Sequence, residues 1–157
     1  MKILLIQIEK TNDLYLLEGI KNYNERLKNY ISLATETIVM PKSVRQKPMD
    51  EQKTAEAKEI LNLIEPSDFV VCLDEHGKQL SSTAFAEFLN KRMVSGCKRL
   101  VFIIGGPYGI DKTVLEKSQY ALSLSAMTFS HQMVRLFFSE QLYRAFTILK
   151  NEKYHHE

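Results

Sequence analysis

Two glycine-containing corners are the places in this sequence where backbone and side chains are best placed to do chemistry. Residues 105–109 read Gly-Gly-Pro-Tyr-Gly, follow an apolar stretch and precede a helix expected to begin near Asp111. Three glycines in five residues allow the backbone to approach a ligand closely. On spacing alone, this corner is either a ligand-binding loop or a tight strand-to-helix turn. In the second corner, residues 73–78, the acids Asp74 and Glu75 are more typical of a solvated turn than of catalysts.

A third segment, residues 124–131, mixes small hydroxylated residues with apolar ones directly before a helix N-terminus. This composition suits a pocket for an adenosine-like ligand, with apolar walls and a few hydroxyl and backbone hydrogen bonds. A snug connector between two elements has the same composition. The chain ends with adjacent histidines, His155 and His156, but they have no cysteine or carboxylate partners at metal-ligand spacing. The sequence therefore predicts no metal site.

The elements that must position these segments are short apolar stretches alternating with helical patterns. Strands are expected at residues 2–8, 35–40, 68–73, 99–104 and 120–124. Helices are expected at residues 13–28, 50–64, 82–94 and 131–150, the last with Ser130 as its N-cap. Continuous apolar stretches such as 100–104 are typical of strands buried on both faces. The alternation predicts an α/β fold with a wound, mainly parallel sheet and helices on both faces.

The helix expected at 131–150 is apolar around most of its circumference, with only a narrow polar stripe. A helix that is apolar on most sides must be buried on most sides. In a domain of this size, we expect one side to pack on the sheet and another on a second subunit, which predicts a homodimer. The helix at 13–28 has its own apolar side, which includes Leu14 and Leu17.

Length and composition are those of one globular domain spanning residues 1–157. Hydrophobic residues make up 45% of the chain and charged residues 25%, close to the average for soluble proteins. Uninterrupted apolar stretches reach only five residues, far short of the roughly 20 that span a bilayer. Cys72 and Cys97 do not form a CxxC pair, and both lie in or beside apolar segments, so we expect a reduced, cytoplasmic protein.

The net charge of +2 is too small to indicate a nucleic-acid partner, but it is unevenly distributed. Residues 1–90 carry 11 basic and 14 acidic side chains, whereas residues 91–157 carry 10 and 5. This asymmetry is compatible with a basic face for a polyanion and equally with ordinary scatter of surface charge.

Four motifs, in order and with matching gaps, resemble the RlmH family of the SPOUT superfamily, bacterial methyltransferases that modify large-subunit ribosomal RNA. These motifs are residues 103–109, 122–135 and 140–146, and the ending Tyr154-His155. The resemblance runs along the whole chain. Three positions depart from it: Tyr108 replaces a common acid, Ser130 a common proline, and His156 an arginine that some members have. These departures do not change the interpretation as a methyltransferase, but they leave open which side chain contacts the RNA.

The resemblance implies methyl transfer from S-adenosylmethionine to N3 of a pseudouridine in 23S rRNA of the assembled ribosome. It also implies a C-terminal trefoil knot and a homodimer, with no DNA or membrane partner. The residues that match the family's cofactor pocket are Leu73, Gly105, Leu124, Ser125, Ala126, Met127, Thr128 and Phe129. The candidates for catalysis are His131, Arg135, Arg144, Tyr154 and His155. A basic loop with Lys42, Arg45 and Lys47 is a candidate rRNA phosphate contact.

Two other functions stay open at this point. One is a non-catalytic ribosome- or RNA-binding α/β protein that keeps the pocket only as structure. The other is a SPOUT methyltransferase that acts on a different RNA. His131 also has a purely structural explanation, since an imidazole at a helix start can simply cap the helix.

Overall fold

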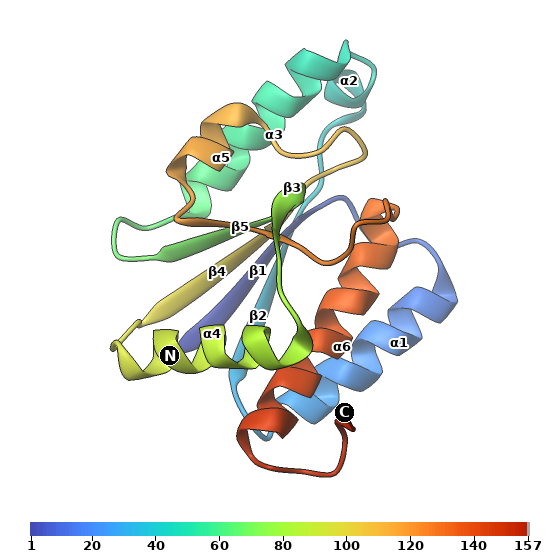
Figure 1. Ribbon diagram of the computed structural model, residues 1–157. Helices are drawn as coiled ribbons and strands as arrows, with labels where there is room; N and C mark the ends of the chain where they lie inside the picture. Colours follow the sequence, from blue (N-terminus) through green and yellow to red (C-terminus); the bar gives the residue numbers. More distant parts are fainter. Residues whose placement is uncertain (157) are drawn as a thin grey trace.

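The computed structural model, in which residues 1–156 are described, contains one five-stranded sheet covered by helices on both faces (Figure 1). The strands are β1 (Lys2–Ile8), β2 (Ser32–Ile38), β3 (Phe69–Gln79), β4 (Arg99–Ile104) and β5 (Tyr120–Ser123). The helices are α1 (Leu14–Leu27), α2 (Lys42–Arg45), α3 (Met49–Leu63), α4 (Ser82–Val94), α5 (Lys112–Lys117) and α6 (His131–Leu149). The predicted α/β class is confirmed. Within the described part of the chain, no helix is both long and apolar enough to cross a membrane.

All pairings in the sheet are parallel, and the strand order is β2-β1-β4-β3-β5. One core lies between the sheet and α1, α4 and α6, and a second lies between the sheet and α3 and α5. The inner strands β1, β3 and β4 contribute side chains to both cores, which explains their continuous apolar stretches. The carboxyl ends of all five strands therefore meet at one edge, where ligands bind in open α/β sheets.

Strand β3 does not end at Leu73 as predicted but continues to Gln79. Between Leu73 and Lys78 the register shifts, so residues 74–77 form an arc that leaves the sheet and returns to it. Leu122 of β5 is paired with Leu73 before the arc and with Lys78 after it, so the arc closes around the end of β5. Such pairing between distant segments leaves no periodic signal in the sequence.

Helix α6 is buried mainly by its own chain. Phe138 and Leu142 are fully buried, and α6 packs against both α1 and α4. These two helices cover much of the apolar circumference that was expected to need a second subunit. Thr147, one of the residues in the narrow polar stripe of the helix expected at 131–150, is also fully buried.

Helix α1 differs in part from its predicted orientation. Leu27, which was also predicted on the apolar side, is buried, but Leu14 and Leu17 are 75% and 43% exposed and Leu16 faces the core. Apolar residues are spread around α1, so spacing alone did not determine which side would pack on α6 and the sheet. Two large apolar side chains are left on the surface as a result.

The arc around β5 depends on Gly77, and replacing this residue tests that dependence. A Cβ atom at Gly77 would lie 2.6 Å from the carbonyl carbon of Ala121, a backbone atom that cannot rotate away. We expect Gly77→Ala to lower the free energy of unfolding by about 1–3 kcal/mol, measured by urea denaturation. The neighbouring His76→Ala is the control, because the His76 side chain is 85% exposed. Equal stability of Gly77→Ala and the wild type would contradict the close crossing.

Candidate functional site

A cavity of about 530 Å³ opens at the carboxyl ends of β3, β4 and β5. It is formed by the start of the arc, the glycine loop after β4 and the segment between β5 and α6. Of the eight residues predicted to bind the cofactor, all except Ala126 line this cavity. The three unusual segments of the sequence therefore lie together, and the volume is typical of small-molecule sites.

The lining of the cavity divides into an apolar wall and a polar rim. Leu73, Ile104 and Ile110 contribute to the wall, and all three are buried. Asp74 and Glu75 stand on the rim, and the Thr128 hydroxyl donates a 3.1 Å hydrogen bond to Glu75. Apolar surface suits an adenine ring and a methionine chain, and the two carboxylates suit a cationic sulfonium. The residues present thus fit S-adenosylmethionine.

The glycine loop closes tightly on itself beside the cavity. The Gly109 N–H donates to the Gly106 carbonyl over 3.1 Å, and Gly109 has a φ of 83°, which favours glycine. A Cβ atom on Gly105 would lie 2.8 Å from the Gly109 backbone. The two interpretations of this corner are therefore compatible, because a tight turn forms the wall of the cavity. Gly105 is required first by the turn itself.

A buried carboxyl group supports the glycine loop from behind. Glu56 of α3 is only 7% exposed, and its Oε1 lies 3.1 Å from where a Cβ atom of Gly106 would stand. Burial, reinforced by the charge of Glu9, raises the pKa of Glu56 to about 7. Glu9 itself has a left-handed backbone with φ of 64°, and its carboxylate accepts a 2.9 Å hydrogen bond from the Met40 N–H.

His131 lines the cavity as the first residue of α6. The predicted cap Ser130 is confirmed, since its hydroxyl accepts from the Met133 N–H at 3.2 Å. Burial and then the charge of Arg135 lower the pKa of His131, with Glu9 acting in the opposite direction. The imidazole is therefore mostly neutral near pH 7 and able to accept a proton.

Arg135 points into the protein. It is fully buried, and its guanidinium donates to the Ile8 carbonyl and, over 2.8 Å, to the Thr11 hydroxyl. Burial lowers the pKa of Arg135 to about 10, which still leaves it charged at neutral pH. These contacts hold the chain that follows β1, and they place Arg135 away from the cavity lining.

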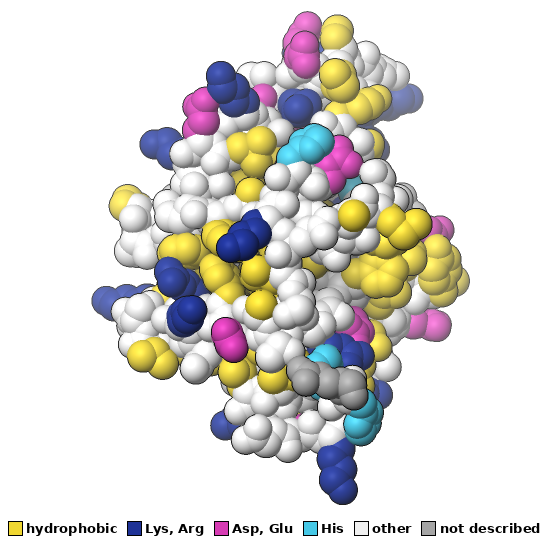
Figure 2. Space-filling view, viewed as in Figure 1, with side chains coloured by type: hydrophobic (Ala, Val, Ile, Leu, Met, Phe, Trp, Pro, Cys, Tyr) yellow, Lys and Arg dark blue, Asp and Glu magenta, His cyan; other side chains and the backbone are white. Residues whose placement is uncertain are grey.

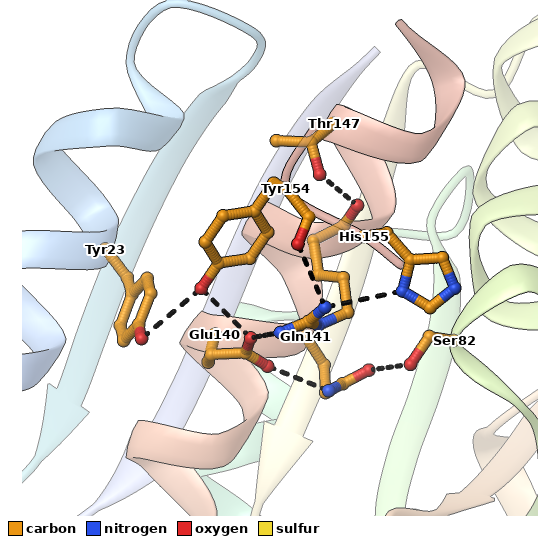
Figure 3. A network of polar contacts seen from close by, with 8 residues as sticks. Tyr23, Ser82, Glu140, Gln141, Thr147, Tyr154 and His155 are labelled. Atoms are coloured by element: carbon orange, nitrogen blue, oxygen red, sulfur yellow. Dashed lines mark hydrogen bonds and ion pairs between the residues drawn. The ribbon is translucent and has the colours of Figure 1, made fainter. Parts of the chain in front are cut away.

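The remaining catalytic candidates form a network at the other end of α6 (Figure 3). Glu140 Oε1 accepts from Arg144 Nη2 at 2.6 Å and from the Tyr154 hydroxyl at 3.1 Å. Arg144 Nη1 lies 3.3 Å from His155 Nδ1, and its guanidinium stacks 4.7 Å from the Tyr154 ring centre. Tyr154 and His155 are therefore held against α6 rather than frayed.

The five predicted catalytic residues thus fall into separate groups. Arg144 follows His131 by thirteen residues, which is about 20 Å along a helix axis. A smaller cavity of about 250 Å³ shares Leu122, Ser123 and Leu124 with the larger cavity and is bounded by Gln141.

Two polar residues of this region were missed as site residues. Glu140 is the centre of the network, and its i,i+4 spacing to Arg144 was the available signal. Gln141 joins the network to the smaller cavity, and its place in the 140–146 motif was the available signal.

The basic loop that was predicted to contact phosphate is partly neutralised within the chain. Lys42 and Arg45 lie in α2, and Arg45 is 3.9 Å from Glu9. Lys47 is 3.6 Å from Glu51. Lys42 is exposed.

The whole chain is similar to known methyltransferases. Residues 1–155 match the family model described as a predicted SPOUT methyltransferase. The chain is 53% identical over 156 residues to the ribosomal RNA large subunit methyltransferase H of Christiangramia forsetii, with 99% of each covered. It is 52% identical over 157 residues to the protein of that name from Flavobacterium psychrophilum, with 100% of each covered. A solved probable methylase family protein from Haemophilus influenzae shares the fold, with a TM-score of 0.55 and 15% identity over 99% of this chain and 70% of that one.

The raised pKa of Glu56 makes stability depend on pH. Because the folded state binds the proton more tightly than the unfolded state, the contribution of Glu56 is fully present below pH 4.5 and is lost as the pH rises through about 7. We expect Glu56→Gln to remove this loss and to stabilise the protein above pH 7 by up to about 3 kcal/mol. Unfolding free energies of both proteins at pH 5 and pH 8 measure the effect. A difference that does not grow with pH would contradict the assignment.

Proposed function

The chain belongs to the SPOUT methyltransferase family, and from this premise we propose that it methylates large-subunit ribosomal RNA with S-adenosylmethionine as the methyl donor. The observation that carries the proposal is full-length identity above 50% to relatives named for that activity. The cavity at the carboxyl ends of the strands supports it. We further infer that the acceptor is N3 of a pseudouridine in 23S rRNA and that the enzyme works in the cytoplasm, where ribosomes are assembled.

The larger cavity would hold the cofactor. Bound there, S-adenosylmethionine supplies an electrophilic methyl group, whose S–CH₃ bond breaks as the N–CH₃ bond forms. The protein's part is to orient the cation between the apolar wall and the carboxylates of Asp74 and Glu75, and to exclude water. Backbone groups of the glycine loop, which lines the cavity, would supply hydrogen bonds to a nucleoside.

Proton removal is the second task of the protein, because N3 of the acceptor loses its hydrogen as it gains the methyl group. A base on the enzyme must take that proton. His131 beside the cofactor cavity and His155 beside Arg144 are the two imidazoles available in this region. The Arg144 guanidinium suits the negative charge that develops on the carbonyl oxygens of the deprotonated base.

The finer fold assignment, a C-terminal trefoil knot, rests on the arc around β5. The segment 120–130 continues from within the arc to α6 on the sheet face opposite α5. In Figure 1 the arc crosses this segment, and Thr128 is bonded to Glu75 of the arc. These contacts support a threaded chain, which physical priors alone would disfavour.

A homodimer is supported by an apolar surface rather than by the whole circumference of α6. Asn12 N–H donates to Gln132 Oε1, so the N-terminal ends of α1 and α6 lie side by side. Hydrophobic side chains gather on the surface around these helix ends (Figure 2). The exposed apolar side chains of this surface include Leu14, Leu17, Met127, Phe129 and Phe137. Phe129 also lines the cofactor cavity, so a second subunit on this surface would complete the cavity's outer wall.

The proposed activity can be tested by mass mapping of 23S rRNA from cells with and without this gene. A single methyl group at N3 of a pseudouridine should be lost with the gene and restored in vitro by the purified protein with S-adenosylmethionine. Binding of ribosomes without methyl transfer would instead indicate the non-catalytic RNA-binding protein, and methylation of another RNA would indicate a different SPOUT specificity.

Removal of residues 153–157 should separate cofactor binding from catalysis. Tyr154 contacts α6 and α1, and none of the described residues 153–156 lines the cofactor cavity, so affinity for S-adenosylmethionine should stay near wild type. Methyl transfer to ribosomes should fall by roughly 100-fold, the scale expected when positioning or proton transfer is lost. Melting temperature, cofactor titration and methyl incorporation measure the three properties. Full activity without the tail would remove Tyr154 and His155 from the site.

The dimer surface is tested by comparing two adjacent phenylalanines of α6. Phe137 is 36% exposed and packs 4.8 Å from Phe129, whereas Phe138 is fully buried. Phe137→Asp should give folded monomers with reduced activity, because a charge would be placed on the interface. Phe138→Asp should instead unfold the chain. Sedimentation at micromolar concentration, with circular dichroism as the fold control, distinguishes these outcomes; a monomeric wild type would overturn the dimer.

A further inference from the structure

The C-terminal end of α4 carries three positive charges that the proposed function leaves unused. Lys91 and Arg92 lie in its last turn, and Lys98 follows the turn that ends the helix. The Cys97 N–H donates to the Arg92 carbonyl at 3.1 Å, which keeps Lys98 close to the helix end. Within residues 1–156, none of the three cations is ion-paired, not even Lys91 with Glu87, which precedes it by four residues. We call these three cations the α4 basic surface.

Aromatic rings hold the Arg92 guanidinium in place without satisfying its donors. Its central carbon lies 4.5 Å from the ring centre of Phe69 and 5.6 Å from that of Phe88. Its Nε is buried without a hydrogen-bond acceptor, and the described residues offer no acceptor to its Nη atoms either. A guanidinium donates two parallel hydrogen bonds to phosphate oxygens. Arg92 is therefore an oriented cation whose donors still lack an acceptor.

An aromatic side chain and a further lysine continue the α4 basic surface across the edge of the sheet. Tyr120 begins the edge strand β5, its ring lies 5.0 Å from that of Phe88, and its hydroxyl has no partner among residues 1–156. Lys78 is exposed and is paired in register with Leu122, so it lies on the same sheet face as Tyr120. Cations beside aromatic rings are typical of surfaces that bind nucleic acids.

The α4 basic surface is separate from the two cavities. None of its three cations lines either cavity. Phe69, which lies under Arg92, is four residues before the cavity residue Leu73, or about 13 Å along β3. Figure 2 shows dark-blue side chains around an apolar patch over α4, on the opposite side of the view from the apolar surface at the ends of α1 and α6. A partner on the α4 basic surface would therefore leave the proposed dimer surface free.

We propose that the α4 basic surface, with Lys78 and Tyr120 beside it, is a docking surface for the phosphate backbone of ribosomal RNA, away from the site of methyl transfer. This inference rests on the proposed function, because it assigns a second contact with the same substrate. Cations without counter-ions and unused N–H and O–H donors are complementary to a chain that carries a negative charge at each nucleotide. Contacts of this kind position an RNA without reading its sequence.

The test removes the two exposed charges of the α4 basic surface and measures methyl transfer to ribosomes. Lys91→Gln combined with Lys98→Gln should raise KM for ribosomes on the order of 10-fold and leave kcat at saturating ribosomes near wild type. The slope of log affinity against log salt concentration should become shallower by about one to two, because fewer counter-ions are released on binding. Arg92→Met, which keeps an apolar side chain on the rings, should raise KM in the same direction, with melting temperature as the fold control.

A matched double variant controls for the loss of net charge. Lys58→Gln combined with Lys117→Gln removes the same charge from exposed positions of α3 and α5, on the other face of the sheet. Its KM for ribosomes should stay near wild type. An equal rise of KM in both double variants would indicate general attraction by net charge and would overturn the inference. An unchanged KM in the Lys91 and Lys98 double variant would overturn it as well.

Binding to 23S rRNA freed of ribosomal proteins identifies the kind of partner. The Lys91 and Lys98 double variant should lose affinity for this RNA as well as for ribosomes. A loss confined to intact ribosomes would indicate a protein partner and overturn the assignment to RNA. A wild type that binds ribosomes but transfers no methyl group overturns the proposed function itself, whereas the binding comparison still decides on the docking surface.

Discussion

The crossing of β3 over the end of β5 is the contact on which the rest of the site depends. Leu122 is paired with Leu73 and with Lys78, and the absence of a side chain at Gly77 lets the two backbones approach this closely. The crossing puts the segment after β5 beside the glycine loop after β4, which creates the larger cavity. It also directs the chain to the sheet face opposite α5, where α6 can pack against α1 and α4.

Helix α6 then connects the parts of the site through polar side chains that bond to distant segments. Arg135 is fully buried, and a buried guanidinium needs acceptors. The Ile8 carbonyl and the Thr11 hydroxyl accept from its two Nη atoms, so the chain after β1 is fixed relative to α6. Near the other end Glu140 accepts hydrogen bonds from Arg144 and Tyr154, so Tyr154 is fixed to the same helix.

The local elements could be predicted from sequence because their signals are local. The strands at 2–8 and 99–104, the helix start near Asp111 and the cap Ser130 are found where the sequence predicted them. The cofactor cavity could also be anticipated, since strand ends in a parallel sheet share one edge and glycine-rich corners follow them. The orientation of helix α1 and the pairing between distant segments could not be predicted. Leu14 was predicted to lie on the apolar side of its helix but is exposed, and the residues after Leu73 were predicted to form a simple turn but form the arc. Both depend on contacts between segments far apart in the chain.

The charged side chains at the two ends of the proposed site match the charges that the proposed reaction involves there. In the proposed reaction, the carboxylates of Asp74 and Glu75 on the rim of the larger cavity would face the cationic donor. Arg144, which is paired with Glu140, would face the negative charge that develops on the acceptor base. Because methyl transfer removes positive charge from the donor as the acceptor loses its proton, opposite charges at the two ends favour the reaction in the same direction.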